Sequence, residues 1–551
     1  MEQTPKDWAM SASLVIVLLY VFWLCRKPIW FYAEIWRRSR ALRHLPGPQY
    51  GLLGIVPQLV SRKIHKQATT WANQFGPVYR VRFMCYHAMV VTDPHLAREL
   101  LRCRQLDKFS YQYMQLRAFL IGPNLLSSRT DARYLNIRKG VCPAFNSGSL
   151  RTFVPLVRER VGFLVELLKV HGVDKPTNVD DLLLRLSMDV TGRFGLKKEF
   201  SALEGAVPGS TEGQGSYCQT LVRCCEEVWR RMSSPAATIF GLPRGLQRKG
   251  DASFNRWKVL VAGLLKHVKT VEAPAGSYAD LLLKIRDPKT GQPLDDVAMM
   301  GEISTLLFGG LDTTSHTNAW TLYFLSQHPE VEAKVVAELE ASQLLVTASR
   351  PQPRMPEYDD LQRLNYLKCV IKEVLRMVPP VGAGQIRVAL KDDIVLCNGS
   401  LKLPRGTMVW VPHHAIQNCE HNWDEPTKFM PERWAASDAE YAQKPSALPK
   451  EWQVGMDSNS TTERARRFMP FADGIRTCIG QSLAMATMPL TLAGLLSHFS
   501  FKLADRMGGA AGVMEREQYT LVTGIKDGLW MHAVPRCTVP VVCTAAPSAA
   551  A

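Results

Sequence analysis

A cysteine near the C-terminal end carries the most specific chemistry in this sequence. Cys478 follows a turn-forming Gly474 and precedes Gly480, which stands at the start of a predicted helix. Backbone N–H groups and the positive end of the helix dipole stabilise a thiolate there, which suits a metal-binding sulfur. Arg476 adds a cation, and Phe471 can shield the sulfur from water. A lone cysteine between glycines is more often a buried structural thiol, so the metal-site prediction depends on all five positions occurring together.

The segment over residues 471–480, FADGIRTCIG, resembles the heme-binding loop of the cytochrome P-450 superfamily. It fills every fixed position of the pattern Phe-x-x-Gly-x-Arg-x-Cys-x-Gly. The resemblance implies heme (iron protoporphyrin IX) as the cofactor and Cys478 as the axial ligand of its iron. It also implies the cytochrome P-450 fold, which is mainly α with a smaller β region, and heme-binding roles for four further residues, which are Phe471, Gly474, Arg476 and Gly480.

A second group of residues lies in a long apolar stretch, about residues 290–326, that predicts a helix. Gly309 and Gly310 together should cost a helix about 2 kcal/mol relative to alanines, which is tolerated where the helix kinks or another group approaches its backbone. Asp312 and Thr313 can relay protons through water, although close helix packing with hydroxyls bonded to the preceding turn is the alternative. The stretch resembles the family's oxygen-activation motif. That resemblance implies that Gly310 borders the heme, Thr313 hydrogen-bonds dioxygen and Asp312 helps to deliver protons.

Glu373 and Arg376 share one face of a helix that paired prolines end. Exposed pairs of this kind are common and contribute little to stability. Glu-x-x-Arg before Pro-Pro resembles the family's scaffold motif, however, and its implied partner is Arg433 in the segment FMPERW. Two arginines around one carboxylate would form a rigid polar core. These three residues are therefore predicted to serve structure and heme incorporation, and no chemical step.

Further cofactor contacts are implied by the resemblance alone. Tyr134 and Arg138, at helical i, i+4 spacing, take the places where the family has a Trp and an Arg that hold a heme propionate; a surface helix with two cations is the alternative. Arg387 is implied to reach a propionate, and residues 381–386 to line the substrate pocket. Residues 523–528 are predicted to form a turn whose tip contacts substrate.

Local patterns predict two hairpins, one over residues 78–83 and 89–92 and one around Asn398-Gly399. The formal charge is +17, and no basic–aromatic nucleic-acid motif is present, so an anionic membrane and an acidic protein partner explain the sign better than nucleic acid. The thirteen cysteines contain no Cys-x-x-Cys pair, which favours a reducing compartment.

The N-terminal part of the chain predicts a membrane anchor. Residues 9–25 form an uncharged apolar run, and six basic residues against one acid follow over residues 26–44. By the positive-inside rule, the bulk of the chain then faces the cytosol. A cleaved signal peptide is disfavoured, because no small-residue cleavage site follows. The predicted order is an N-terminal tail (1–8), one transmembrane helix (9–25), a basic linker with a proline-rich hinge (26–48), a heme-thiolate catalytic domain (49–543) and a low-complexity tail (544–551).

Together these features predict a heme-thiolate monooxygenase. It would insert one atom of O2 into a hydrophobic small molecule, such as a lipid, sterol or terpenoid, at the endoplasmic reticulum membrane. The sequence has no Gly-x-Gly-x-x-Gly nucleotide site, so electrons would come from a separate NADPH-cytochrome P-450 reductase. The alternatives are a heme-thiolate isomerase or dehydratase that works without external O2, and a non-catalytic heme sensor.

Overall fold

The structure is a computed structural model, and it describes residues 42–49, 51, 54–83, 86–108, 110–173, 175–207, 217–234, 244–391, 394–435, 448 and 466–537. The predicted anchor (9–25) and the predicted tail (544–551) lie outside these residues. Across the described ranges, no helix combines the length and the apolar character needed to cross a membrane.

Helices make up most of the described chain, which confirms the mainly α part of the predicted fold class. The α-helices are α2 (Val56–Val60), α3 (Ile64–Phe75), α4 (Pro94–Arg102), α5 (Ser110–Phe119), α6 (Ala132–Val141), α7 (Ser147–His171), α8 (Val179–Leu196), α9 (Tyr217–Ser233), α11 (Arg244–Thr270), α12 (Tyr278–Lys284), α13 (Asp296–Gln327), α14 (Pro329–Ala341), α15 (Asn365–Met377), α16 (His413–Asn418), α18 (Gln481–Leu496) and α19 (Gly509–Arg516). Short 3₁₀ turns include η5 (Cys397–Gly399), η6 (Pro431–Trp434) and η8 (Gly474–Arg476).

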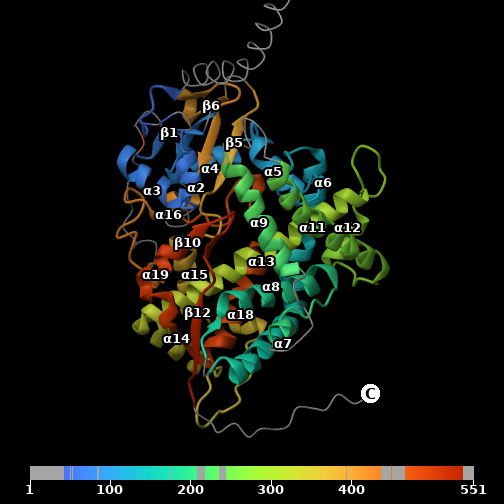
Figure 1. Ribbon diagram of the computed structural model, residues 1–551, viewed down its shortest axis with the longest axis vertical. Coiled ribbons are helices and arrows are strands. Elements are labelled where there is room, and N and C mark those ends of the chain that lie inside the picture. The colour runs from blue at the N-terminus through green and yellow to red at the C-terminus, as the bar shows by residue number, and fades with distance from the viewer. Residues whose placement is uncertain are drawn as a thin grey trace, which may run out of the picture.

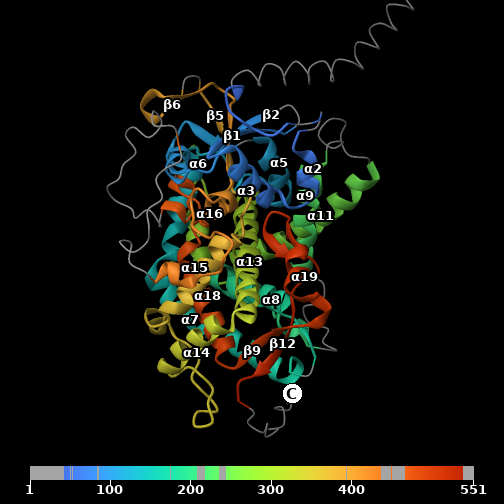
Figure 2. The same cartoon turned by 90° about the vertical axis from the view of Figure 1, so that its left-hand side faces the viewer.

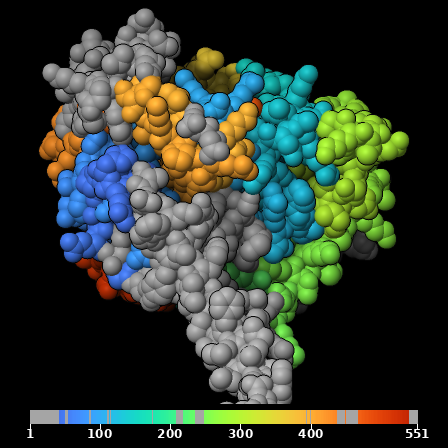
Figure 3. Space-filling view, turned by 90° about the horizontal axis from the view of Figure 1, so that it is seen from above, coloured from blue at the N-terminus to red at the C-terminus, as the bar shows by residue number. Residues whose placement is uncertain are grey.

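The strands form one five-stranded sheet, in the order β1-β2-β8-β5-β3, and three small sheets, which pair β10 with β11, β4 and β9 with β12, and β6 with β7. Their bounds are β1 (Val78–Phe83), β2 (Tyr86–Val91), β3 (Leu106–Lys108), β4 (Thr177–Asn178), β5 (Gln385–Ala389), β6 (Ile394–Leu396), β7 (Leu401–Leu403), β8 (Met408–Val411), β9 (Phe499–Leu503), β10 (Glu517–Tyr519), β11 (Thr523–Ile525) and β12 (Trp530–Pro535). The larger sheet thus joins segments more than 300 residues apart, and Figure 3 shows the part of the chain near residue 400 (orange) beside the N-terminal part (blue) on one face.

Helix α13 is the central element of the fold. It runs through the middle of the molecule with α8 and α18 beside it (Figures 1 and 2) and is buried over most of its length. The helix begins at Asp296 rather than near residue 290, because the Asp295 side chain accepts a hydrogen bond from Ala298 N and caps it. Pro329 opens the next helix directly after the His328 cap.

The predicted hairpins are confirmed. β1 and β2 pair antiparallel, with the second strand starting at Tyr86, and β6 and β7 pair around η5. The predicted turn over residues 523–528 is wrong in its first half, because residues 523–525 pair with β10 as strand β11. The turn itself lies at Asp527 and Gly528, which both adopt positive φ.

Candidate active site

The loop before α18 holds Cys478 by close backbone packing. Cys478 N donates to Phe471 O at 2.9 Å, which closes the loop on itself. Gly474 has φ +70°, and a Cβ there would come within 2.6 Å of Leu101 O. No larger residue fits this position without moving α4, so the glycine is required by both conformation and space.

The Cys478 thiol is exposed, yet protein surrounds it closely. Burial raises its pKa, while the amides of Gly480 and Gln481 and the charge of Arg138 oppose that shift. The amides point to the sulfur from the start of α18, as the sequence predicts for a metal-binding thiolate.

Two arginines on α4 hold the same loop from outside. Arg98 forms an ion pair with Asp473, and Arg102 Nη2 lies 3.2 Å from the same carboxylate. Asp473 also accepts from Gly474 N at 2.5 Å, and its pKa is lowered by these donors and charges despite burial. Sequence reasoning missed this contact, because Asp473 occupies a variable position of the loop pattern and its partners lie some 370 residues away.

Helix α6 also contacts the loop. Tyr134 donates its hydroxyl to Ile475 O at 2.9 Å, and Arg138 Nη2 donates to Thr477 O at 2.7 Å. The guanidinium of Arg476 lies over the Tyr134 ring, 3.5 Å from its centroid, and donates to Ser128 O at 2.6 Å. The two residues predicted to hold a propionate therefore hold the loop backbone in this structure, and Tyr134 contributes a ring face that the sequence did not indicate.

Three cations from distant segments gather in the interior as a buried cation cluster, defined as Lys108, Arg387 and Arg476. Burial lowers the pKa of Lys108 well below its usual value, and the charges of Arg476 and Arg387 lower it further. Asp107 is the carboxylate that approaches them, with its Oδ1 3.6 Å from Arg476 Nη2. Beside Arg387 lies His413, whose pKa is lowered to about 4 by burial and by the Arg387 charge.

The buried cation cluster fits an anionic cofactor. Arg387 Nη1 and both ring nitrogens of His413 are buried without a hydrogen-bond partner among the residues that the structure describes. Buried donors and charges are normally satisfied, and the single carboxylate of Asp107 does not neutralise the two guanidinium charges of Arg387 and Arg476. The two propionates of heme would supply the missing charge and acceptors. Sequence reasoning missed Lys108, a member of this cluster, and the neighbouring His413. For His413, the adjacent His413-His414 pair at a helix start was the available signal.

The predicted oxygen-activation residues lie at the middle of α13. Gly309 is exposed, and an added Cβ there would meet nothing within 4 Å. Gly310 instead packs against α8, where a Cβ would lie 2.8 Å from Thr191 Oγ1. The sequence prediction placed Gly310 beside the cofactor. Successive residues on a helix point about 100° apart, so the two glycines face different surroundings. The glycine with open space beside it is Gly309. Thr313 is half-buried and donates to Gly309 O at 2.8 Å, which is the helix-bonded geometry named above as the alternative.

Glu302 is a buried acid two turns before Gly309. Its side chain accepts from Leu125 N at 3.0 and 3.3 Å and so ties α13 to the segment between α5 and α6. Burial raises its pKa to about 8, and the Leu125 amide opposes this only in part. The carboxyl is therefore protonated in the folded protein at pH values where the unfolded chain ionises it.

We expect Glu302→Gln to become progressively more stable than the unsubstituted protein as pH rises from 5 to 8. The folded pKa is raised above the unfolded value, so native stability falls across this window, by an amount on the order of 4 kcal/mol when complete. Glutamine keeps the acceptor for Leu125 N and removes the ionisation. Urea denaturation midpoints at four pH values measure the effect, with the exposed Glu340→Gln as the control. A difference between the two proteins that does not change with pH would contradict the expectation.

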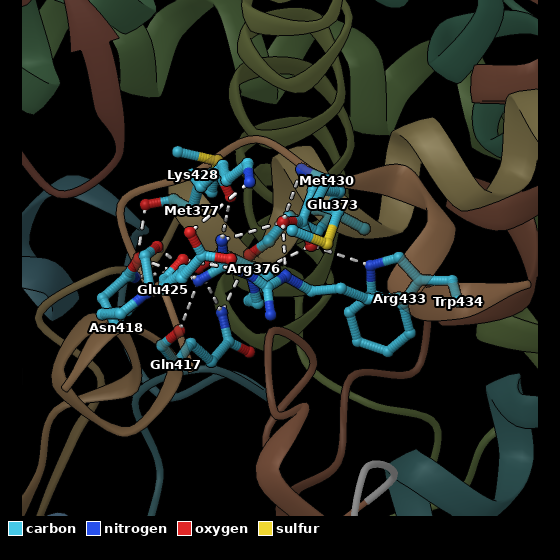
Figure 4. A network of polar contacts seen from close by, with 12 residues as sticks. Glu373, Arg376, Met377, Gln417, Asn418, Glu425, Lys428, Met430, Arg433 and Trp434 are labelled. Atoms are coloured by element: carbon cyan, nitrogen blue, oxygen red, sulfur yellow. Dashed lines mark hydrogen bonds and ion pairs between the residues drawn. The ribbon is translucent and has the colours of Figure 1, made fainter. Parts of the chain in front are cut away.

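The predicted scaffold residues form a buried polar network (Figure 4). Glu373 and Arg376 are both 0% exposed and form a bidentate pair, with N–O distances of 3.0 and 2.9 Å. Arg433 Nε lies 3.3 Å from Glu373 Oε1, so both predicted arginine contacts are present. Trp434 Nε1 adds a hydrogen bond of 2.9 Å to Glu373 Oε2.

This network reaches the cysteine loop through Gln417 on α16. Gln417 Nε2 donates to the backbone oxygens of Leu375 and Arg376, and its Oε1 accepts from Met469 N at 2.7 Å. One amide side chain thus joins α15 to the chain two residues before Phe471. Gln417 could not be predicted as a functional residue, because its role depends on three segments meeting in space.

Comparisons with known proteins agree with this geometry. Over residues 45–510 the chain matches the family model described as Cytochrome P450. Similar proteins are Cytochrome P450 714C2 of Oryza sativa subsp. japonica (24% identical, over 91% of this chain and 94% of that protein), cyclooctat-9-en-7-ol 5-monooxygenase of Streptomyces melanosporofaciens (25%, over 82% and 88%) and the human mitochondrial 25-hydroxyvitamin D-1 alpha hydroxylase (26%, over 89% and 92%). The protein is therefore a heme-thiolate enzyme of the cytochrome P450 family.

Proposed function

We propose that this enzyme is a monooxygenase that inserts one oxygen atom of O2 into a hydrophobic small molecule of lipid, sterol or terpenoid type. The observation that carries the proposal is the acid–threonine pair, Asp312 and Thr313, placed mid-way along the central helix beside the exposed backbone of Gly309. Two of the similar proteins are named for a monooxygenase and a hydroxylase activity, on cyclooctat-9-en-7-ol and on 25-hydroxyvitamin D. Both names support the same reaction class here.

Different residues of this chain would bind different parts of the cofactor. Bound heme supplies the O2 and electron chemistry, and a thiolate ligand favours cleavage of the O–O bond. Cys478 would provide that thiolate, and Phe471 would exclude water from the sulfur. The buried cation cluster would neutralise the propionates, with the neutral His413 able to donate one further hydrogen bond.

Asp312 and Thr313 would transfer protons to the site of the reaction. Thr313 bonds to Gly309 O through its proton, but both lone pairs of its hydroxyl can still accept from water. Asp312 is one residue away and mostly buried, so it can hold a proton next to that hydroxyl without open exchange with solvent. Ordered delivery of protons favours product over unproductive reduction of O2.

We expect Thr313→Ala to consume NADPH while forming about tenfold less product per NADPH. The substitution removes the hydroxyl that organises water beside Asp312 and leaves the helix fold unchanged. Thr317→Ala is the matched control, because Thr317 makes the same bond to the preceding turn, to Thr313 O at 2.8 Å, but is buried. The measurement is the ratio of product to NADPH in the heme-loaded enzyme.

The same assay separates the rival functions. If the enzyme converts a peroxide substrate with neither NADPH nor a reductase, the isomerase or dehydratase function is favoured and the monooxygenase proposal fails. A screen of apolar compounds, first for ligand-induced spectral changes and then for turnover, tests the sensor function. That function is favoured if the protein binds heme but converts none of the compounds. Equal coupling in Thr313→Ala and the unsubstituted enzyme would also contradict the proposal.

We propose the following cellular setting. Residues 49–543 would form the catalytic domain, and residues 9–25 would anchor it as a single span in the endoplasmic reticulum membrane, facing the cytosol. The basic residues over 26–44 support this orientation. Electrons would come from NADPH through a separate cytochrome P-450 reductase, since the sequence carries no Gly-x-Gly-x-x-Gly site. Removing residues 1–25 should release the enzyme from microsomal membranes.

A further inference from the structure

A histidine links the proton-delivery acid to a second carboxylate. His316 lies on α13 one turn after Asp312, and its Nε2 is 3.2 Å from Asp312 Oδ1. On its other side, Nδ1 lies 2.8 Å from Oδ1 of Asp180, near the start of α8. The result is an acid–imidazole–acid chain between two packed helices.

The three side chains are mostly shielded from water, with exposed fractions of 18% for His316, 10% for Asp312 and 12% for Asp180. An ionised carboxylate can only accept hydrogen bonds, and a neutral imidazole has only one N–H. Contact with an acceptor at both nitrogens therefore requires the doubly protonated ring. Burial by itself lowers the pKa of His316, but the charges of Asp180 and Asp312 outweigh it and raise the pKa well above its ordinary value.

The other described elements packed around the His316 ring add no charged group to the two carboxylates. Strand β11 faces it with Gly524, where a Cβ would lie 2.9 Å from His316 Nε2, so this strand contributes backbone and no charge. Helix α9 contributes the Cys225 thiol near Asp312, and burial together with the Asp312 charge raises the pKa of that thiol and keeps it neutral. Within the described residues, the charged groups acting on His316 are thus the two carboxylates.

The contact also defines what Asp312 can do. Oδ1 is occupied by the imidazolium, and no other described group bonds to this carboxylate, which is not among the fully enclosed unpaired atoms. Its second oxygen is therefore open to water. A carboxylate held by this contact keeps one orientation, whereas a carboxylate without it could rotate.

We propose that His316, itself held by Asp180, is a positioning residue that fixes the orientation of the Asp312 carboxylate and thereby sets proton delivery at Thr313. This inference rests on the proposed monooxygenase function. A proton taken from water by Asp312 passes to the water or hydroxyl at Thr313, and the carboxylate returns to its ionised form. His316 stays protonated throughout, so the cycle needs no co-reactant beyond solvent protons.

The test uses the heme-loaded full chain and two variants, His316→Asn and Asp180→Asn. Asparagine at 316 removes the positive charge, and asparagine at 180 removes the carboxylate that holds the ring without touching α13. We expect product per NADPH to fall about tenfold in both, a loss typical of outer-shell partners, with KM for substrate unchanged. His328→Asn, at the end of the same helix, is the control and should leave the product formed per NADPH unchanged.

A readout that needs no turnover accompanies the kinetics. For a histidine whose pKa is raised by folding, the stabilisation is complete below the unfolded value near 6.5 and is lost as pH rises through the folded value. The stability gap between the unsubstituted protein and His316→Asn should therefore be largest at pH 6 and narrow at alkaline pH. Nitrogen-15 NMR of the resting protein should show the His316 ring doubly protonated at pH 7.5.

The outcomes are distinct. If either folded variant forms as much product per NADPH as the unsubstituted enzyme, the Asp312–His316–Asp180 contact only holds α8 against α13, and the inference is overturned. A singly protonated His316 ring at pH 7.5 would overturn it as well. If His316→Asn does not fold, Asp180→Asn and the NMR measurement decide alone. Failure of the proposed function looks different, since the unsubstituted enzyme would then form no product from NADPH and O2, whatever the state of His316.

Discussion

Cys478→Ser should abolish the cysteinate signature of the enzyme while leaving a folded, heme-binding protein. Reduced under carbon monoxide, the unsubstituted enzyme is expected to show a strongly red-shifted Soret band, and the serine variant is expected to lose it. A serine hydroxyl is a harder and far less acidic ligand than a thiol, so it cannot push the same electron density onto iron. Monooxygenase turnover should fall to the detection limit.

The structure supplies a control for this substitution. Cys142 is also an exposed cysteine and stands directly after helix α6, which contacts the Cys478 loop. Cys142→Ser changes the same atom at a helix end and should keep both the band and the activity. A folded, heme-loaded Cys478→Ser protein with the unshifted spectrum of the parent, or with full activity, would contradict the assignment of the axial ligand.

Residues whose constraint is local were predictable from the sequence. Gly474 could be assigned as a turn residue because the loop turns there with a φ of +70°, a local conformation that favours glycine. Glu373 and Arg376 could be paired because helical spacing puts them on one face. The hairpin strands followed from alternation and the Asn-Gly turn. In each case, the determining contacts lie within a few residues or within one repeated motif.

Features that depend on the meeting of distant segments were not predictable. The buried cation cluster draws Lys108 from β3, Arg387 from β5 and Arg476 from the cysteine loop, and only the five-stranded sheet places the first two opposite each other, where they pair in register. His316 and Asp180 are 136 residues apart. A lone histidine on a helix carries no signal of such a partner, because the partner belongs to another element.

Rotation about a helix axis is a second feature that the sequence did not determine. Gly309 and Gly310 are adjacent in the sequence, yet one faces open space and the other faces Thr191 of α8. The choice between them depends on which neighbour packs on which side of α13. The Gly-Gly pattern predicts close approach of another group, and the structure shows such an approach at Gly310, from Thr191.

The second large effect is expected at Glu373, the centre of the buried polar network. Its two oxygens accept from Arg376, Arg433, Trp434 and the backbone amide of Met430 at 3.1 Å. Glutamine at this position turns one acceptor into a donor that faces donors, and it leaves two buried guanidinium groups without a counter-charge. Breaking a buried pair on one side costs about 3–5 kcal/mol, far more than an exposed pair. We therefore expect Glu373→Gln to lose a large part of the stability and to incorporate little heme.

Glu166→Gln is the matched control, because Glu166 and Lys169 form a carboxylate–cation pair at the same i, i+3 spacing, 2.7 Å apart, with both side chains exposed. That substitution should change stability by about 0.5 kcal/mol or less. Urea midpoints and the heme content after expression measure both variants. Since Gln417 carries the network to Met469 N, just before the Cys478 loop, heme content should fall along with stability in Glu373→Gln. Equal midpoints and heme contents in the two variants would mean that the network is dispensable, and the link from α15 to the cysteine loop would have to be abandoned.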